Sequence, residues 1–277
     1  GYASHGKTGI ELLGNYQLLS SHAYFLERFV NEVQEQKNIG DNVITTLDYE
    51  LQKTAYEALG DYRGTVIALE PSTGKVLAMV SKPDYNPNEI DANWKDISGS
   101  STSVLLNRAT QGLYPPGSTF KILTLLEYMR EGNDLENWTY ECNGSYEQDG
   151  VTINCYHNSV HGTIDLKTSF AKSCNTSFSN MGLSLDRAEF AATCTRLLFN
   201  QSLPLSKLSS KSSTVVLETD TSDSDVMQTA IGQGKTLMTP MHLAMITSAI
   251  ANDGTLMIPY QGDKIKTSEG GTVKTYK

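Results

Sequence analysis

Apolar residues recur at helical spacing over residues 10–36, with polar residues at the intervening positions. The pattern predicts one or two amphipathic helices, which end before the Gly40-Asp41-Asn42 break. A short run rich in β-branched residues follows at 43–47 and is typical of a strand. Asp48 is then placed to cap a further helix over 49–59.

The clearest strand signal lies at residues 64–81. Two nearly continuous apolar runs, 65–69 and 76–80, are separated by the turn sequence Pro71-Ser72-Thr73-Gly74. This arrangement predicts a β-hairpin. Because both faces of these strands are apolar, we expect them in a sheet that is covered on both faces.

Helices and loops alternate along the rest of the chain. Proline, asparagine and serine predict a polar loop over 82–104. A Pro-Pro-Gly turn then introduces a helix over 118–130. Two more helices are predicted over 166–183 and 239–254, and the polar tail at 255–277 predicts a pair of strands.

Composition narrows the function classes. The 277 residues are 39% hydrophobic, enough for one large domain or for one domain with a small appendage. The net charge of −9, without a dense run of Lys or Arg, argues against nucleic acid as a partner. No apolar run reaches the about 18–20 residues of a membrane span. No Cys/His group has the usual zinc spacing, so we expect neither a metal nor a cofactor.

Four cysteines raise the question of disulfides. Cys142 and Cys155 flank a glycine-containing stretch, and a bridge between them would contribute about 3 kcal/mol in the chain-entropy model. Free thiols fit the composition equally well. Cys174 and Cys194 fall in helical patterns and are interpreted as small buried hydrophobic residues.

Ser118 and Lys121 are the strongest candidates for chemistry. Residues at this spacing share one face of a helix, so the lysine amine can reach the serine hydroxyl. A hydroxyl becomes a useful nucleophile when a neighbouring base takes its proton, and lysine can be that base if burial lowers its pKa. A serine at the start of a helix also lies at the positive end of the helix dipole.

The Ser-x-x-Lys spacing is weak evidence on its own, because it occurs four times. Only Ser118 begins a predicted helix and follows a Pro-Pro-Gly turn. Ser173-Cys174-Asn175 is the only Ser-x-Asn, and its hydroxyl and amide can relay protons and hold a substrate amide. Taken alone, a polar helix face explains that tripeptide better. The other Ser-x-x-Lys pairs are Ser4/Lys7, Ser72/Lys75 and Ser169/Lys172.

Taken together and in order, these motifs resemble the transpeptidase domain of class B penicillin-binding proteins. The resemblance covers nearly the whole chain, and its joint specificity exceeds that of any single piece. The matching stretches are Thr46-Leu47-Asp48, residues 65–71, Leu106-Asn107-Arg108-Ala109, residues 113–121, His161-Gly162, Ser173-Cys174-Asn175, Ile231-Gly232-Gln233-Gly234 with Thr239-Pro240, and residues 251–255.

The resemblance implies an α/β fold of the penicillin-recognising serine transpeptidase and β-lactamase type, with helices on both faces of an antiparallel sheet. It divides the chain into a linker or pedestal remnant at 1–41 and a transpeptidase domain at 42–277. It also implies a location on the outer face of a bacterial cell membrane, with an anchor in an N-terminal segment not present in this chain. An exported location would favour the disulfide between Cys142 and Cys155.

The implied reaction is peptidoglycan cross-linking by D,D-transpeptidation through an acyl-enzyme. Ser118 would attack the carbonyl of a stem peptide or of a β-lactam, and Lys121 would take its proton. Ser173 would relay a proton to the leaving amine, and Asn175 would hold the substrate backbone. The implied partners are peptidoglycan stem peptides, β-lactam antibiotics and proteins of cell division or elongation.

One element of the family pattern departs from this order. A Lys-Thr/Ser-Gly motif should follow the Ser-x-Asn motif, yet Lys7-Thr8-Gly9 precedes it, and Lys235-Thr236-Leu237 lacks the glycine. The resemblance therefore implies a chain that is incomplete at its C-terminus, without its last sheet strands. We expect such a chain to react poorly with penicillin, because an oxyanion donor and a carboxylate-binding lysine would be absent.

Two other functions remain open from the sequence. A serine β-lactamase or β-lactam sensor would share the fold and the Ser-Thr-Phe-Lys motif. An inactive fragment or pseudoenzyme that binds cell-wall partners would explain the absence of the third motif. Ser-Cys-Asn and the Gly-Gln-Gly block favour the cell-wall enzymes over the first alternative.

Overall fold

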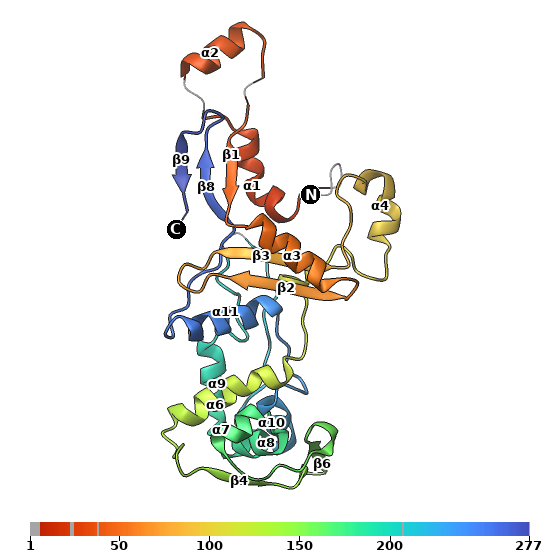
Figure 1. Ribbon diagram of the computed structural model, residues 1–277, viewed down its shortest axis with the longest axis vertical. Helices are drawn as coiled ribbons and strands as arrows, with labels where there is room; N and C mark the ends of the chain where they lie inside the picture. The colour runs from red at the N-terminus through yellow and green to blue at the C-terminus, as the bar shows by residue number, and fades with distance from the viewer. Residues whose placement is uncertain (1–5, 23–24, 38, 207, 277) are drawn as a thin grey trace. The chain divides into compact units, whose positions relative to one another are not determined.

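The computed structural model describes residues 6–22, 25–37, 39–206 and 208–276 (Figure 1). The chain forms two compact units, and it passes between them several times. Unit 1 comprises residues 1–112, 204–210 and 240–277, and unit 2 comprises residues 113–203 and 211–239. Among the described helices, none is both long enough and apolar enough to cross a membrane.

An antiparallel hairpin of β2 (Gly64–Leu69) and β3 (Val76–Lys82) is central to unit 1. Its strands match the predicted hairpin, and alternate residues of β3 are buried. Helix α3 (Tyr49–Leu59) packs mainly on β3 and α11 (Pro240–Ala251) packs on β2. Figure 1 shows these helices on opposite sides of the hairpin, which confirms the prediction of helices on both faces. Asp48 caps α3 by accepting a hydrogen bond from the Leu51 amide.

A second sheet of unit 1 has the order β1-β8-β9 and is antiparallel throughout. Its central strand comes from the C-terminal tail, so the predicted strand pair is confirmed. Helix α1 packs against β1, and the predicted region 10–36 contains two helices. The bounds are β1 (Asn42–Thr45), β8 (Gly262–Lys266), β9 (Thr272–Thr275), α1 (Gly9–Leu19) and α2 (Phe25–Val33).

The predicted polar loop at 82–104 is partly wrong, because it contains the helix α4 (Ile90–Ser98). Ile90 is buried, and it shares helical spacing with Trp94 and Ile97. The surrounding prolines, asparagines and serines are typical of loops, so these few apolar residues did not lead to a helix prediction. The short helix α5 (Arg108–Gln111) follows.

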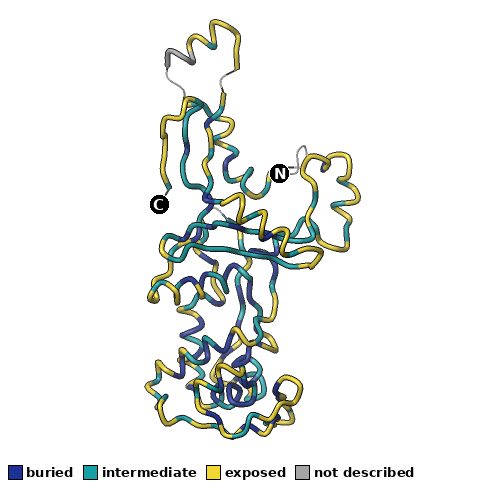
Figure 2. Tube along the Cα trace, in the orientation of Figure 1, coloured by how far each residue is buried: buried dark blue, intermediate teal, exposed yellow. Residues whose placement is uncertain are grey.

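Unit 2 is a helical bundle around a core of aromatic and methionine side chains. Phe120 packs against Phe190 and Phe199, with ring centroids 6.3 and 5.6 Å apart. Figure 2 shows buried residues concentrated where the helices meet. The bundle contains η2 (Gly117–Phe120), α6 (Lys121–Arg130), α7 (Leu166–Ala171), α8 (Asn175–Ser184), α9 (Arg187–Arg196) and α10 (Asp223–Ala230).

Four short strands form the other part of unit 2. They make two antiparallel pairs, β4 with β7 and β5 with β6. A single helical turn, η3, connects the second pair to β7. The bounds are β4 (Thr139–Cys142), β5 (Ser145–Gln148), β6 (Val151–Asn154), η3 (Tyr156–Asn158) and β7 (Gly162–Asp165).

The single helix predicted over 166–183 is wrong, because the structure breaks it into α7 and α8. Ser173 lies at the break with φ 51°, a left-handed conformation that is uncommon for a non-glycine residue. Asp165 caps α7 by accepting a hydrogen bond from the Thr168 amide. Helical periodicity continues across the break, so the pattern alone did not reveal it.

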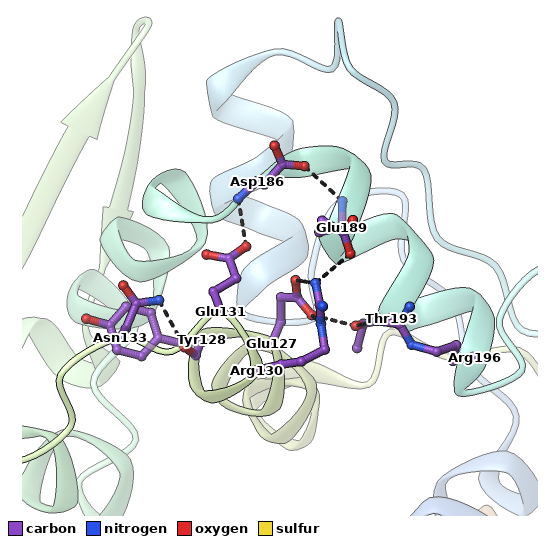
Figure 3. Close-up of polar contacts among 9 residues, drawn as sticks. All are labelled: Glu127, Tyr128, Arg130, Glu131, Asn133, Asp186, Glu189, Thr193 and Arg196. Carbon is purple, nitrogen blue, oxygen red and sulfur yellow. Dashed lines mark hydrogen bonds and ion pairs between the residues drawn. The ribbon is translucent and has the colours of Figure 1, made fainter.

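A polar network holds α6 against α9 (Figure 3). The buried Glu127 carboxylate accepts two hydrogen bonds from Arg130, at 2.8 and 2.7 Å, and one from Thr193 at 2.5 Å. Arg130 also pairs with Glu189 at 2.6 Å. Burial alone would raise the pKa of Glu127, but the bonds from Arg130 and Thr193 outweigh it and hold the pKa below its ordinary value.

We expect Arg130→Ala to lower the free energy of unfolding at neutral pH by more than Arg196→Ala does, because a buried carboxylate would lose its counter-charge. The loss should be smaller than for a fully buried pair, since the Arg130 side chain is 42% exposed. The depressed Glu127 pKa stabilises the fold above the unfolded-state pKa, and this contribution disappears as pH falls through the folded-state pKa. The deficit measured by urea denaturation should therefore shrink in acid.

Arg196→Ala is the matched control. Arg196 donates to the Thr193 hydroxyl at 2.5 Å and not to the Glu127 carboxylate. Arg196→Ala should therefore lower the free energy of unfolding by less than Arg130→Ala does, and this loss should depend only weakly on pH. Equal losses for the two variants, or an Arg130→Ala deficit that persists in acid, would contradict the role of the Glu127 pair.

Candidate active site

Ser118 and Lys121 lie at the junction of η2 and α6. The chain enters η2 from Pro116 and Gly117, and Lys121 is the first residue of α6. The predicted helix therefore begins with a tighter 3₁₀ turn, which carries Ser118. Ser118 is exposed, whereas Lys121 is only 1% exposed. A reactant can thus reach the hydroxyl while its neighbouring amine is screened from water.

The Lys121 amine makes polar contacts with all three of the other predicted site residues. Its Nζ lies 3.2 Å from Ser118 Oγ, within the hydrogen-bond reach that their helical spacing predicted. The same nitrogen lies 2.9 Å from Ser173 Oγ and 2.7 Å from Asn175 Oδ1. It also donates to the Ser173 carbonyl at 2.7 Å. The structure therefore brings all four predicted site residues together around one amine.

The surroundings of Lys121 favour the neutral amine. All four of these hydrogen-bond partners are uncharged oxygens. Burial disfavours the charged ammonium and lowers the pKa of Lys121 to about 8, against a weaker opposing effect of Cys174 and Cys155. A substantial fraction of the amine is thus neutral near physiological pH and has a lone pair that can accept a proton.

The turn from 173 to 175 is shaped by the break between α7 and α8. The left-handed backbone of Ser173 directs both its carbonyl and its hydroxyl to the Lys121 amine. The Asn175 side chain is fixed at both ends, since Nδ2 donates to the Asn154 carbonyl at 2.9 Å while Oδ1 accepts from Lys121. The turn is thus held by β6 on one side and by α6 on the other.

The Gly232-Gln233-Gly234 segment contacts the turn that carries Ser118. The Gly117 amide donates to the Gly232 carbonyl at 2.9 Å, and Tyr114 pairs in both directions with Met238. Gly232 has φ +70°, and an added Cβ would lie 2.2 Å from the Gly117 carbonyl oxygen. Only glycine fits there without displacing the turn.

This arrangement has the parts needed for nucleophilic catalysis at a carbonyl. It provides an exposed hydroxyl, a buried amine of lowered pKa within hydrogen-bond reach, and a second hydroxyl that can pass a proton onward. The Ser118 amide lies at a helix N-terminus, where backbone N–H groups have no partner in a preceding turn and can face an oxyanion.

The other motif matches lie in different surroundings. Ser72 is exposed in the β2–β3 turn, and Ser169 is buried in α7, where its hydroxyl contacts Ser177 at 2.5 Å. Ser4 lies outside the described residues. Lys7 belongs to unit 1 and pairs with Glu11 at 2.5 Å, and Lys235 pairs with Asp225 at 3.0 Å.

Sequence reasoning missed a compact group of three cysteines and a histidine beside this turn. Cys142, Cys155, His161 and Cys174 place one ligand atom each within 4.8 Å of one another. Cys142 and Cys155 are free thiols with sulfurs 3.7 Å apart, so the structure brings together the two residues that the sequence offered for a disulfide. The spacings along the chain resemble no familiar zinc motif, and only the fold reveals the group.

Cys174 and Cys194 differ in their surroundings, although both are buried as predicted. Cys174 lies at the N-cap of α8 within the thiol group, whereas Cys194 is in α9, where burial raises its pKa to about 12. For Cys142, burial alone would raise the pKa, but hydrogen bonds from Thr176 and from the backbone of His161 and Gly144 hold it below its ordinary value.

Comparison with known families identifies the domain. The sequence model of the penicillin binding protein transpeptidase domain matches residues 64–277. This chain belongs to that family. The penicillin-binding transpeptidase fold expected from the sequence is thereby confirmed.

Individual relatives agree with this transpeptidase family. The peptidoglycan D,D-transpeptidase PbpA of Mycolicibacterium smegmatis is 34% identical over 254 residues, which cover 85% of this chain and 51% of the relative. The chain thus spans about half the length of this relative.

Solved transpeptidase structures are also similar. A ceftriaxone acyl-enzyme complex of penicillin-binding protein A from Mycobacterium tuberculosis has TM-score 0.89 and 28% identity, covering 99% of this chain and 65% of that one. A complex of penicillin-binding protein PBP2 with MreC from Helicobacter pylori has TM-score 0.74 and 25% identity, covering 81% of this chain and 45% of that one.

Gly232→Ala tests the close approach behind Ser118 in this transpeptidase domain. We expect it to lower the free energy of unfolding by roughly 3 kcal/mol, because backbone strain adds to an overpacked contact. Gly234→Ala has the same positive φ, +66°, but its Cβ would meet the Gln228 side chain at 3.2 Å. Gly234→Ala should lower the free energy of unfolding by only about 1 kcal/mol. Equal losses in urea denaturation would argue against the Gly117 contact.

Proposed function

We propose that this transpeptidase domain cross-links peptidoglycan by D,D-transpeptidation through an acyl-enzyme on Ser118. The observation that carries the proposal is the Lys121 amine, which is buried, has a lowered pKa and contacts Ser118, Ser173 and Asn175 together. The relatives named peptidoglycan D,D-transpeptidases support the reaction class.

Acylation would begin with Ser118. Its Oγ bonds to the carbonyl carbon of a D-alanyl stem peptide while Lys121 Nζ takes the hydroxyl proton. The Ser118 amide stabilises the resulting oxyanion. Collapse of the tetrahedral intermediate breaks the C–N bond, and the proton passes from Lys121 through Ser173 Oγ to the leaving amine.

Cross-linking would reverse these steps with a second amine. The amine of a neighbouring stem peptide attacks the acyl carbon, gives up its proton through the same Ser173 and Lys121 pair, and releases Ser118. Asn175, held at both ends of its amide, orients the substrate backbone. A β-lactam would enter the first half of the cycle and remain attached, because its leaving amine stays tethered to the acyl group.

The proposed substrate indicates the cellular location of this domain. Peptidoglycan lies outside the cytoplasmic membrane, so we place this domain on the extracytoplasmic face. The complex of an H. pylori relative with MreC supports a cell-shape protein as a partner. A division or elongation protein would then decide where the cross-links are made.

Fluorescent penicillin provides the direct test on the full-length protein. We expect stoichiometric covalent labelling that Ser118→Ala abolishes, because the acyl bond forms on its Oγ. Ser72→Ala is the matched control, since Ser72 is an exposed serine of a second Ser-x-x-Lys pair. It should label normally, and peptide mass spectrometry should locate the adduct on the peptide that contains Ser118.

Two outcomes would overturn the proposal. Labelling of Ser118→Ala at the wild-type level would exclude Ser118 as the nucleophile. Rapid loss of the adduct with turnover of penicillin would identify a β-lactamase instead, whereas a long-lived adduct is expected of a transpeptidase.

The pH dependence of acylation tests Lys121 as the base. Its pKa of about 8 means that the neutral amine increases as pH rises through that value. The acylation rate constant should therefore rise about tenfold from pH 7 to pH 9 and level off above. Lys121→Arg should abolish labelling, because a guanidinium stays charged throughout this range. A flat or falling profile for the wild-type protein would exclude this role.

A further inference from the structure

The thiol and imidazole group beside the active site is assembled from four separate segments of unit 2. Cys142 ends β4, Cys155 precedes η3, His161 precedes β7 and Cys174 precedes α8. The three cysteines are buried and His161 is half-buried. Apolar side chains could fill the positions of these three thiols equally well. Hydrophobic packing alone therefore does not explain why three cysteines surround one imidazole.

The distances within the group fit a tetrahedral metal site. Cys155 Sγ lies 3.7 Å from the sulfurs of both Cys142 and Cys174. Two thiolates bound to zinc at about 2.3 Å each are about 3.8 Å apart in a tetrahedron. His161 Nδ1 lies 3.3 and 3.9 Å from the sulfurs of Cys142 and Cys155, on either side of the about 3.6 Å expected for a zinc-bound imidazole and thiolate.

The same distances disfavour a disulfide as the resting arrangement. A disulfide needs sulfurs about 2.05 Å apart and uses two cysteines. Here Cys155 is equidistant from the sulfurs of Cys142 and Cys174, and one ring nitrogen of His161 lies within 4.8 Å of all three sulfurs.

The groups around the ligands suit a bound cation. The Thr176 hydroxyl lies 3.3 Å from the Cys142 sulfur and 3.4 Å from that of Cys174, and it can donate to a thiolate. Hydrogen bonds of this kind fix ligand orientation in metal sites. Soft thiolates with one imidazole select zinc over the hard cations magnesium and calcium.

We propose that Cys142, Cys155, His161 and Cys174 bind one zinc ion in a closed Cys₃His site. Four protein ligands complete a tetrahedron and leave no position for a reacting water, so the ion has a structural role. It joins β4, β7 and the segment after β6 to the turn that precedes α8.

The consequence for the active site rests on the proposed function. Cys174 lies between Ser173 and Asn175, so a metal bond to its sulfur fixes the backbone that positions both side chains. The left-handed backbone of Ser173 is strained, and the metal bond at the next residue offsets that strain. Metal removal should therefore free Asn175 and the Ser173 hydroxyl from the Lys121 amine.

Metal analysis of the full-length protein, purified under reducing conditions with zinc, tests the site itself. We expect one equivalent of zinc that is lost in Cys142→Ser and in His161→Ala but kept in Cys194→Ser, a buried cysteine outside the group. Replacement of zinc by cobalt(II) should give the intense visible bands of a tetrahedral ion and thiolate charge transfer in the near ultraviolet. This readout needs no enzymatic activity and can be made on Ser118→Ala.

Three results would overturn the metal site. They are a reduced, folded wild-type protein without zinc, equal zinc content in the Cys142→Ser and Cys194→Ser variants, and a cobalt spectrum without thiolate bands. A Cys142–Cys155 disulfide in protein isolated from its native compartment, detected by peptide mass mapping, would also overturn it.

The coupling to the active site is measured separately. Removing zinc from the wild-type protein with a chelator under reducing conditions should slow penicillin labelling about 10- to 100-fold, because a small displacement of positioning groups has effects of that size. Adding zinc back should restore the rate, which a protein that had simply unfolded would not do. Unchanged labelling after complete zinc removal would refute the coupling. Failure of the wild-type holoprotein to label at all would instead refute the proposed function.

Discussion

The burial of one lysine amine governs the arrangement of this transpeptidase site. Lys121 sits at the start of α6 among uncharged oxygens, where its ammonium loses most of its hydration and gains no carboxylate partner among the described residues. The fold tolerates this cost because aromatic packing around Phe120 fixes η2 and because the Glu127 network fixes the other end of the helix. A rigid helix keeps the amine in the polar pocket.

Strain at the active site is distributed over two turns. Ser173 has a left-handed backbone, and Gly232 occupies a position that a side chain could not share with Gly117. The Ser173 conformation aims its hydroxyl and carbonyl at Lys121, and the Gly232 conformation admits the Gly117 backbone that precedes Ser118. Proteins commonly hold such local costs at functional sites and offset them by packing elsewhere.

The strand pairs of unit 2 contact the candidate site on the side opposite α6. They carry no predicted catalytic residue, yet β6 supplies the carbonyl that holds Asn175, and the ends of β4, β6 and β7 surround Cys174. The turn at residues 173–175 is therefore connected to a sheet region as well as to the helical bundle. This connection explains how residues far from Ser118 along the chain can influence its environment.

Local sequence determined much of this protein. The apolar runs of β2 and β3, the Asp48 cap and the Ser-x-x-Lys spacing each act within a few residues, so periodicity and capping chemistry were enough to predict them. The ordered series of motifs likewise indicated the transpeptidase family before any coordinates. The helix at 90–98 was missed, because its few apolar residues lie in a strongly polar segment.

Tertiary structure alone decided the break at Ser173, the convergence on Lys121 and the meeting of Cys142 with Cys174. Helical periodicity is insensitive to one residue that changes its backbone conformation, so the sequence predicted a continuous helix there. The burial that lowers the Lys121 pKa comes from segments distant along the chain. Likewise, Cys155 and Cys174 are 19 positions apart in sequence but 3.7 Å apart in space. Spacing along a chain does not determine a distance that depends on how separate turns and strands pack.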